Sequence, residues 1–173
     1  MILKAKEITK QVKKGNITIE PFDESLLKPN SYIYHLEDTI LEISEISDPK
    51  EPIKTKELKI TKEGLTLMPH KLYLGTTKET LGSKKYVSSL TGRARTGKLG
   101  LFVQITADLG QIGKAHKWTL EIHVVQPLKI YPNMPIGQIT FWIPKGKIDK
   151  DSVEYYSTKD TPQPSKLFNQ IQS

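Results

Sequence analysis

Glu121 is the carboxylate whose place in the sequence most favours chemistry. In the segment "WTLEIHV" (118–124), alternation of polar and apolar residues puts Thr119, Glu121 and His123 on one face of a predicted strand. A carboxylate in the middle of a strand can act as a general base or acid when its face lines a cleft. The alternative is a solvent-facing strand position. We take Glu121 as the candidate general base and keep both interpretations.

A second group of candidates lies in the segment "GRARTGKLGL" (92–101), which combines three glycines with three cations. Glycines let backbone N–H groups approach an anion closely, and Arg93, Arg95 and Lys98 could donate charge-assisted hydrogen bonds to phosphate oxygens. The alternative is a basic turn that links two strands. The segment therefore predicts either a loop that binds a phosphate-bearing ligand or a basic turn, and the pattern does not decide between them.

The histidines do not predict a metal site. His116 and His123 lie near Glu121 in the sequence, but a third convergent ligand is missing. The chain has no cysteine, which excludes disulfides and Cys-based zinc or redox sites. We therefore expect no bound metal, and we expect His35 and His70 to be surface or interface residues.

Charge and hydropathy limit the class of partner. The 173 residues carry a formal net charge of +7 and a pI of about 9.4, which favours nucleotides, other anions or an acidic protein surface. A solvated lysine surface explains the same charge. The strands offer no aromatic platform for single-stranded nucleic acid, so we expect no nucleic-acid partner. No apolar stretch approaches the roughly 18 residues of a membrane span, and we expect a cytoplasmic protein with no membrane contact.

The elements that must position these residues are predicted to be mostly strands. "AKEITKQVKKG" (5–15) has Ile8 and Val12 at helical spacing and ends in Gly15, which predicts one short helix. Alternating or β-branched segments separated by Pro, Gly and Asn follow it, at 16–22, 31–43, 57–68, 71–80, 86–92, 100–110, 117–125 and 128–143. The predicted class is all-β, a sandwich or barrel with one helix.

The chain is expected to divide into a domain and a tail. Residues 1–144 contain the periodic segments and form one domain. Residues 145–173 are polar and contain prolines, which is typical of a mobile tail or of a lid that orders against something else.

Five motifs in order resemble the dCTP deaminase family of the dUTPase-like superfamily. They are "MILKAKEITKQVKKGNITIEPFD" (1–23), "LKPNSYIYHL" (27–36), "GRARTGKLGL" (92–101), "TLE" (119–121) and "IYPNMPIGQITF" (130–141). The resemblance implies a distorted β-barrel or jelly roll that assembles as a homotrimer, with active sites at subunit interfaces. It also implies that a carboxylate activates water without zinc, and that Mg²⁺ accompanies the nucleoside triphosphate.

The resemblance also implies a set of site residues. Glu121 matches the catalytic glutamate, and the spacing from Thr106 to Glu121 equals the sixteen residues of the family pattern. Main-chain groups near 105–107 would read the cytosine edge. The ligand-binding residues implied are Arg93, Arg95, Lys98, Thr106, Ala107, Gln111, Gln138 and Lys166.

Several family positions are nevertheless substituted in the basic loop. The family loop reads G-R-S-S-x-G-R-x-G-L, so the serine expected to help position water is Ala94, which has no hydroxyl. The position of the second family serine is occupied by Arg95, which could contact phosphate or fill the space that the nucleotide needs. The second arginine is Lys98, which keeps the charge and loses the planar fork.

Substitutions continue outside the loop. The position of the family aspartate near the deoxyribose is occupied by Gln111, whose amide cannot act as a base at neutral pH. The aromatic residue and the glycine that follow are Lys114 and His116, and the aspartate of the S-Y-D segment is Ile33. The tail keeps "PQPSKLF" (162–168) and lacks the family's Tyr and Gln.

These losses favour a pseudoenzyme. Each acid–base group or preorganised donor is typically worth about 10² to 10⁴ in rate, so losing several removes most of the acceleration. Our first hypothesis is a dCTP deaminase-like protein that is inactive or strongly impaired and binds a nucleotide, another phosphate ligand or a protein partner. The alternative is an active, divergent dCTP deaminase of pyrimidine deoxynucleotide metabolism that forms dUTP and ammonia, with Glu121 as its base.

Overall fold

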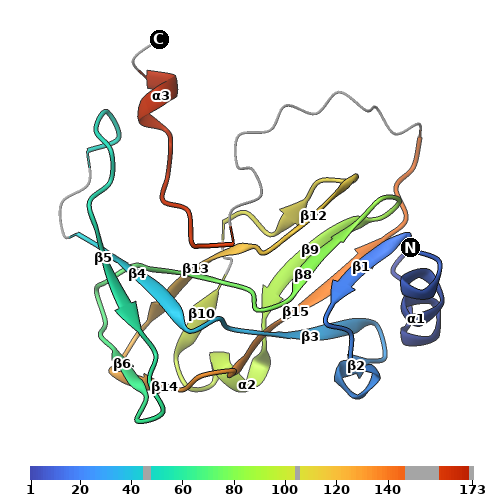
Figure 1. Cartoon of the computed structure of the whole chain (residues 1–173), viewed down its shortest axis with the longest axis horizontal. Coiled ribbons are helices and arrows are strands. Elements are labelled where there is room, and N and C mark those ends of the chain that lie inside the picture. The colour runs from blue at the N-terminus through green and yellow to red at the C-terminus, as the bar shows by residue number, and fades with distance from the viewer. Residues whose placement is uncertain (45–47, 104–105, 147–159, 172–173) are drawn as a thin grey trace.

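The computed structural model describes residues 1–44, 48–103, 106–146 and 160–171 (Figure 1). The chain begins with helix α1 (Ala5–Lys13), which buries Ile8 in the core. Gly15 follows at φ +69°, the left-handed conformation in which glycine commonly ends a helix. The predicted N-terminal helix and its stop are therefore confirmed.

Short strands make up most of the remaining chain. They are β1 (Ile17–Glu20), β2 (Leu27–Lys28), β3 (Ser31–His35), β4 (Thr39–Ile43), β5 (Thr55–Lys59), β6 (Leu65–Leu67), β7 (Tyr73–Thr76), β8 (Thr80–Ser83), β9 (Val87–Gly92), β10 (Leu101–Val103), β11 (Leu109–Gly110), β12 (Lys114–His116), β13 (Thr119–Val124), β14 (Leu128–Ile130) and β15 (Pro135–Trp142). Three short helical segments complete the described elements, η1 (Glu24–Leu26), α2 (Ala94–Gly97) and α3 (Phe168–Ile171). Each predicted strand segment contains a strand, while β2, β12 and all of β8 after Thr80 lie outside the predicted segments.

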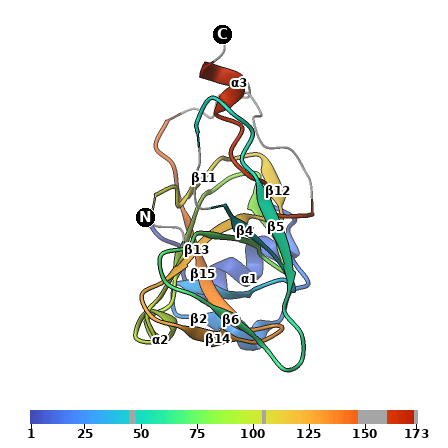
Figure 2. The same cartoon turned by 90° about the vertical axis from the view of Figure 1, so that its left-hand side faces the viewer.

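The described strands form four antiparallel sheets. Two have five strands each, in the orders β10-β13-β7-β4-β5 and β11-β9-β15-β3-β2, and two are smaller, β1-β8-β12 and β14-β6. The all-β class is therefore confirmed. Of the expected distorted barrel or jelly roll, a closed barrel is not found among the described strands, because their ladders end at sheet edges and do not join into a ring (Figures 1 and 2).

The hydrophobic core joins the two five-stranded sheets. Leu120 and Ile122 of β13 and Ile139 and Phe141 of β15 are fully buried in one apolar cluster. Removing such a side chain from water contributes roughly 1.5–3 kcal/mol to folding. This packing fixes the two sheets that carry the candidate residues.

The described part of the tail, residues 160–171, contacts the strand that carries Glu121. Pro162 is buried, and the backbone N–H of Gln163 donates to Thr119 Oγ1 at 3.1 Å. The tail then runs beside the loop between β4 and β5, and both line one open cavity (Figure 1). The boundary predicted at residue 144 stays a prediction.

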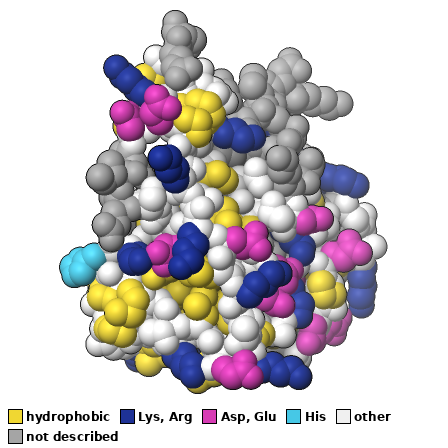
Figure 3. All heavy atoms as spheres, turned by 60° about the vertical axis from the view of Figure 1, so that its left-hand side comes forward, with side chains coloured by type: hydrophobic (Ala, Val, Ile, Leu, Met, Phe, Trp, Pro, Cys, Tyr) yellow, Lys and Arg dark blue, Asp and Glu magenta, His cyan; other side chains and the backbone are white. Residues whose placement is uncertain are grey.

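The surface charge is mixed on the face shown in Figure 3. Lys and Arg side chains lie there among Asp and Glu side chains, so the positive charge does not gather into one patch on that face. None of the described helices is long and apolar enough to cross a membrane.

Candidate active site

Glu121 lies at the middle of β13 with the alternation that the sequence predicts. Leu120 and Ile122 are buried, while Thr119, Glu121 and His123 are half-buried on the opposite face. In the ladder Glu121 stands opposite Leu74 of β7. The carboxylate is therefore fixed by a central strand and open to solvent on one side, as a general base that receives a substrate must be.

The two ends of this face are bordered by other groups. At one end Thr119 Oγ1 accepts the hydrogen bond from the tail residue Gln163. At the other end His123 meets Phe102 of β10 edge to face, with ring centroids 5.3 Å apart. His123 Nε2 is buried and has no hydrogen-bond partner among the described residues.

The histidines do not converge with carboxylates into a metal site. Among the described residues, no group of three or more His, Asp or Glu side chains could hold a metal ion. His116 is stacked on Trp118 at a centroid distance of 4.6 Å. His70 is exposed, as predicted.

The basic loop is a single helical turn. It runs from the end of β9 through α2 to the start of β10, and the side chains of Ala94, Arg95 and Lys98 are exposed. The N–H groups of residues 97–100 donate to carbonyls of residues 93–97 within the same turn. The turn therefore already uses the N–H groups of residues 97–100, and anion binding by the loop stays a prediction that depends on its first residues and on the side chains of Arg95 and Lys98.

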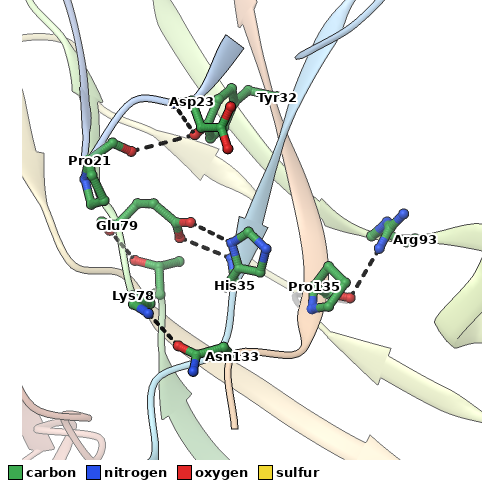
Figure 4. A network of polar contacts seen from close by, with 10 residues as sticks. Pro21, Asp23, Tyr32, His35, Lys78, Glu79, Arg93, Asn133 and Pro135 are labelled. Atoms are coloured by element: carbon green, nitrogen blue, oxygen red, sulfur yellow. Dashed lines mark hydrogen bonds and ion pairs between the residues drawn. The ribbon is translucent and has the colours of Figure 1, made fainter. Parts of the chain in front are cut away.

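Arg93 differs from the other two cations because its side chain turns inward. It is half-buried, and its Nη1 donates to the carbonyl of Pro135 at 3.2 Å (Figure 4). The Thr96 hydroxyl donates to the Arg93 carbonyl at 2.9 Å and closes the turn. Arg93 therefore anchors the loop to β15.

The turn before β13 is organised by Trp118. Its Nε1 donates to the Leu81 carbonyl at 3.0 Å, and its ring fills the space beside Gly110. A Cβ at position 110 would lie 2.2 Å from Trp118 Cη2, so only glycine fits there. Gln111 is exposed beside this turn.

Lys117 has a carboxylate partner in Glu37, at 2.8 Å. Burial raises the pKa of Glu37, but the hydrogen bond and charge of Lys117 outweigh burial and bring the pKa below its ordinary value. The charge of Lys117 is therefore compensated within the chain.

The remaining implied ligand residues are spread over several elements. Gln138 of β15 accepts a hydrogen bond from the Ser31 hydroxyl at 3.0 Å and is half-buried. Thr106 and Ala107 are exposed, and residue 105 lies outside the described residues. Lys166 is half-buried in the tail. Whether these residues bind a ligand stays a prediction.

A hydrogen-bonded pair between His35 and Glu79 was not predicted from the sequence. Glu79 is 3% exposed and lies 2.7 Å through Oε1 from His35 Nδ1 (Figure 4). His35, expected to be a surface or interface residue, is half-buried, with 20% of its side chain accessible. The two positions are 44 residues apart, and no local pattern links them.

The antiparallel sheets of this chain have the dUTPase-like fold of a solved dCTP deaminase. A solved structure of 2'-deoxycytidine 5'-triphosphate deaminase from Agrobacterium tumefaciens has a similar fold, with a TM-score of 0.67 and 19% sequence identity. The match covers 83% of this chain and 48% of that chain, so this chain corresponds to about half of the solved one.

Sequence comparison shows the family to which the chain belongs. The family model for dCTP deaminase-like domains matches residues 2–143. Relatives named "dCTP deaminase, dUMP-forming" from Clostridium beijerinckii and Leptospira biflexa are 46% and 42% identical over 173 residues, covering 99% of each chain. The chain belongs to the dCTP deaminase-like family, as the five motifs predict.

Proposed function

We propose that this protein is a dCTP deaminase in which Glu121 activates the attacking water. The observation that carries the proposal is the half-buried position of Glu121 at the centre of β13, within a chain similar over its full length to relatives named for this activity. That similarity favours the alternative of our sequence analysis over the pseudoenzyme hypothesis. We further propose that the protein works in cytoplasmic pyrimidine deoxynucleotide metabolism.

The proposed chemistry is hydrolytic. The Glu121 carboxylate takes a proton from water and passes it to N3 as the resulting hydroxide adds to C4 of the cytosine ring. The proton of the added hydroxyl then passes to the amino group, which leaves as ammonia while the C4 carbonyl forms. The relatives' name includes "dUMP-forming". We therefore expect a second water to cleave the bond between the α- and β-phosphates, giving dUMP and diphosphate rather than the dUTP expected from the sequence. Mg²⁺ would enter with the triphosphate as part of the substrate.

The substituted loop is expected to limit the rate. Ala94 offers no hydroxyl to hold water, and the loss of one preorganised donor typically costs about 10² to 10³ in kcat. Arg95 and Lys98 are exposed and can still meet the phosphates. We expect a slower enzyme than its relatives rather than an inactive one.

A homotrimer is part of the proposal. The basic loop joins β9 of one five-stranded sheet to β10 of the other, and β10 pairs with β13 near its Val124 end, away from Glu121 at the middle of the strand. Assembly would let the loop of one subunit face Glu121 of the next. Light scattering of the purified protein tests this, and a monomer at assay concentration would contradict it.

A second candidate function is nucleotide binding without turnover. It is favoured by Ala94, which stands exposed on the loop without a hydroxyl. Incubation of the protein with dCTP and Mg²⁺, followed by anion-exchange chromatography and an ammonia assay, separates the two candidates. The proposal predicts dUMP, diphosphate and ammonia in equal amounts. Unchanged dCTP together with binding heat in calorimetry would support the second candidate instead.

A further inference from the structure

Glu79 is a buried carboxylate in the short turn between β7 and β8, outside the residues assigned to the candidate site. Its Oε2 accepts the backbone N–H of His35 at 2.9 Å, and its Oε1 lies 2.7 Å from His35 Nδ1. A carboxylate can only accept, so Nδ1 carries the proton in this pair. The carbonyl of His35 accepts the N–H of Lys78 at 2.8 Å, so the turn holds His35 at three points.

One branch of these contacts leads from Glu79 to the basic loop. His35 stands opposite Pro135 in the β3–β15 ladder, next to the irregularity between Pro135 and Gly137. The Pro135 carbonyl accepts the hydrogen bond from Arg93 Nη1 (Figure 4). Fixing His35 therefore fixes the carbonyl that anchors Arg93.

The other branch leads to the strand of Glu121. The Thr77 hydroxyl donates to the Glu79 carbonyl at 2.7 Å and accepts the Trp118 N–H at 2.9 Å. The Thr77 N–H donates to the Trp118 carbonyl at 3.0 Å. Trp118 is the residue directly before β13, three positions before Glu121.

We propose that Glu79 is a positioning residue, which sets the loop of Arg93 and the strand of Glu121 relative to each other through His35 and Thr77. The proposal rests on the proposed function for its catalytic meaning. Both parts of the site come from this chain, so their spacing within a subunit matters whether a site forms in one subunit or between copies. A buried carboxylate destabilises the fold unless it is paired. The pairing of Glu79 with His35 offsets this cost and holds the turn between β7 and β8 in place.

Glu79→Gln tests the proposal, since the amide keeps the shape and removes the charge that faces His35. We expect kcat to fall about tenfold with KM changed less than twofold, because misplaced groups slow the chemical step. His35→Arg keeps a hydrogen-bond donor against Glu79 and should retain most of the activity. Glu42→Gln breaks an ion pair of similar length, 2.6 Å to Lys71, away from these contacts and should leave kcat unchanged.

Amide hydrogen exchange separates positioning from general destabilisation. In Glu79→Gln we expect exchange to accelerate about tenfold or more in residues 93–100, which the side-chain contacts of Glu79 with His35 hold. The same contacts hold the turn whose main-chain carbonyl at Glu79 binds Thr77, so residues 117–121 should accelerate as well, while the β6–β14 ladder keeps its wild-type rate. Even acceleration over the whole chain, no change in the two segments, or loosened segments with unchanged kcat would each overturn the proposal. If Glu79→Gln does not fold, His35→Gln gives a milder break of the same pair and is judged by the same criteria.

The exchange measurement also keeps this proposal distinct from the proposed function. A wild-type protein without turnover of dCTP would refute the deaminase assignment. The connection from Glu79 to the two segments would still be decided by their exchange rates.

Discussion

The ring of Tyr34 fills the space that a side chain at position 137 would need. Tyr34 of β3 is fully buried opposite Gly137 of β15, and a Cβ there would lie 2.0 Å from the Tyr34 hydroxyl oxygen. The hydroxyl reaches the carbonyl of Thr91 on β9 at 3.3 Å. Burial raises the pKa of Tyr34, so the group stays a donor at any ordinary pH. One side chain thus joins the three central strands of a sheet.

Gly137→Ala should therefore lower the free energy of unfolding by about 1–3 kcal/mol, since the methyl group must displace a packed ring. Gly97→Ala is the matched control, because a Cβ at position 97 meets no atom within 4 Å. Urea denaturation measures both. Equal effects of the two substitutions would contradict the packing described for Tyr34.

The ion pair of Glu37 and Lys117 predicts a pH dependence of stability. The lowered pKa of Glu37 means that the pair stabilises the fold above the ordinary carboxyl value of 4.5 and that this contribution is lost as the pH falls through the folded value. Glu37→Gln should cost up to about 1 kcal/mol at neutral pH. The difference from wild type should vanish below the folded pKa, as followed by thermal unfolding. A difference that is the same at every pH would show that charge is not its cause.

Arg95 is predicted to contact substrate phosphate rather than to block the site. Arg95→Ala should weaken dCTP binding about tenfold in calorimetry, because a charge-assisted hydrogen bond is worth roughly 1.5–3 kcal/mol. Added salt should reduce the affinity of the wild type more than that of the variant. Lys62→Ala removes an exposed lysine in the turn after β5 and is the control. Tighter binding by Arg95→Ala would mean that the side chain occupies the nucleotide's space.

Restoring the loop hydroxyl should accelerate the reaction. Ala94 is exposed at the start of α2, so a serine fits without repacking. We expect Ala94→Ser to raise kcat by about 10- to 100-fold, part of the value of a preorganised donor. Ala115→Ser places the same group on the exposed side of β12 and should change nothing. An unaltered kcat in Ala94→Ser would show that the missing loop hydroxyl does not limit the rate.

Local patterns in the sequence were enough to predict the elements that periodicity controls. The spacing of Ile8 and Val12 and the stop at Gly15 predicted α1, and alternation predicted which residues of β13 face away from the core. The family resemblance, carried by motifs in order, was confirmed over residues 2–143.

Features that depend on distant pairing could not be predicted in this way. Arg93 finds its acceptor at Pro135, 42 residues away, next to a strand irregularity that leaves no local signal. The loop glycines are compatible with an open anion-binding loop and with a helical turn, and only the observed hydrogen bonds decide for the turn. The four sheets follow from pairings between strands, which alternation alone does not specify.

The most direct test compares the rates of dCTP deamination by wild type, Glu121→Gln and Glu57→Gln. Glu57 of β5 lies in the same cross-strand row as Glu121, which runs from Glu121 over Leu74 and Leu41 to Glu57. Its side chain is exposed, so Glu57→Gln is the control for the loss of one strand carboxylate. We predict measurable ammonia release by wild type and Glu57→Gln, and a rate about 10²- to 10⁴-fold lower for Glu121→Gln with unchanged thermal stability. Equal rates for wild type and Glu121→Gln, or no release by the wild type, would contradict it.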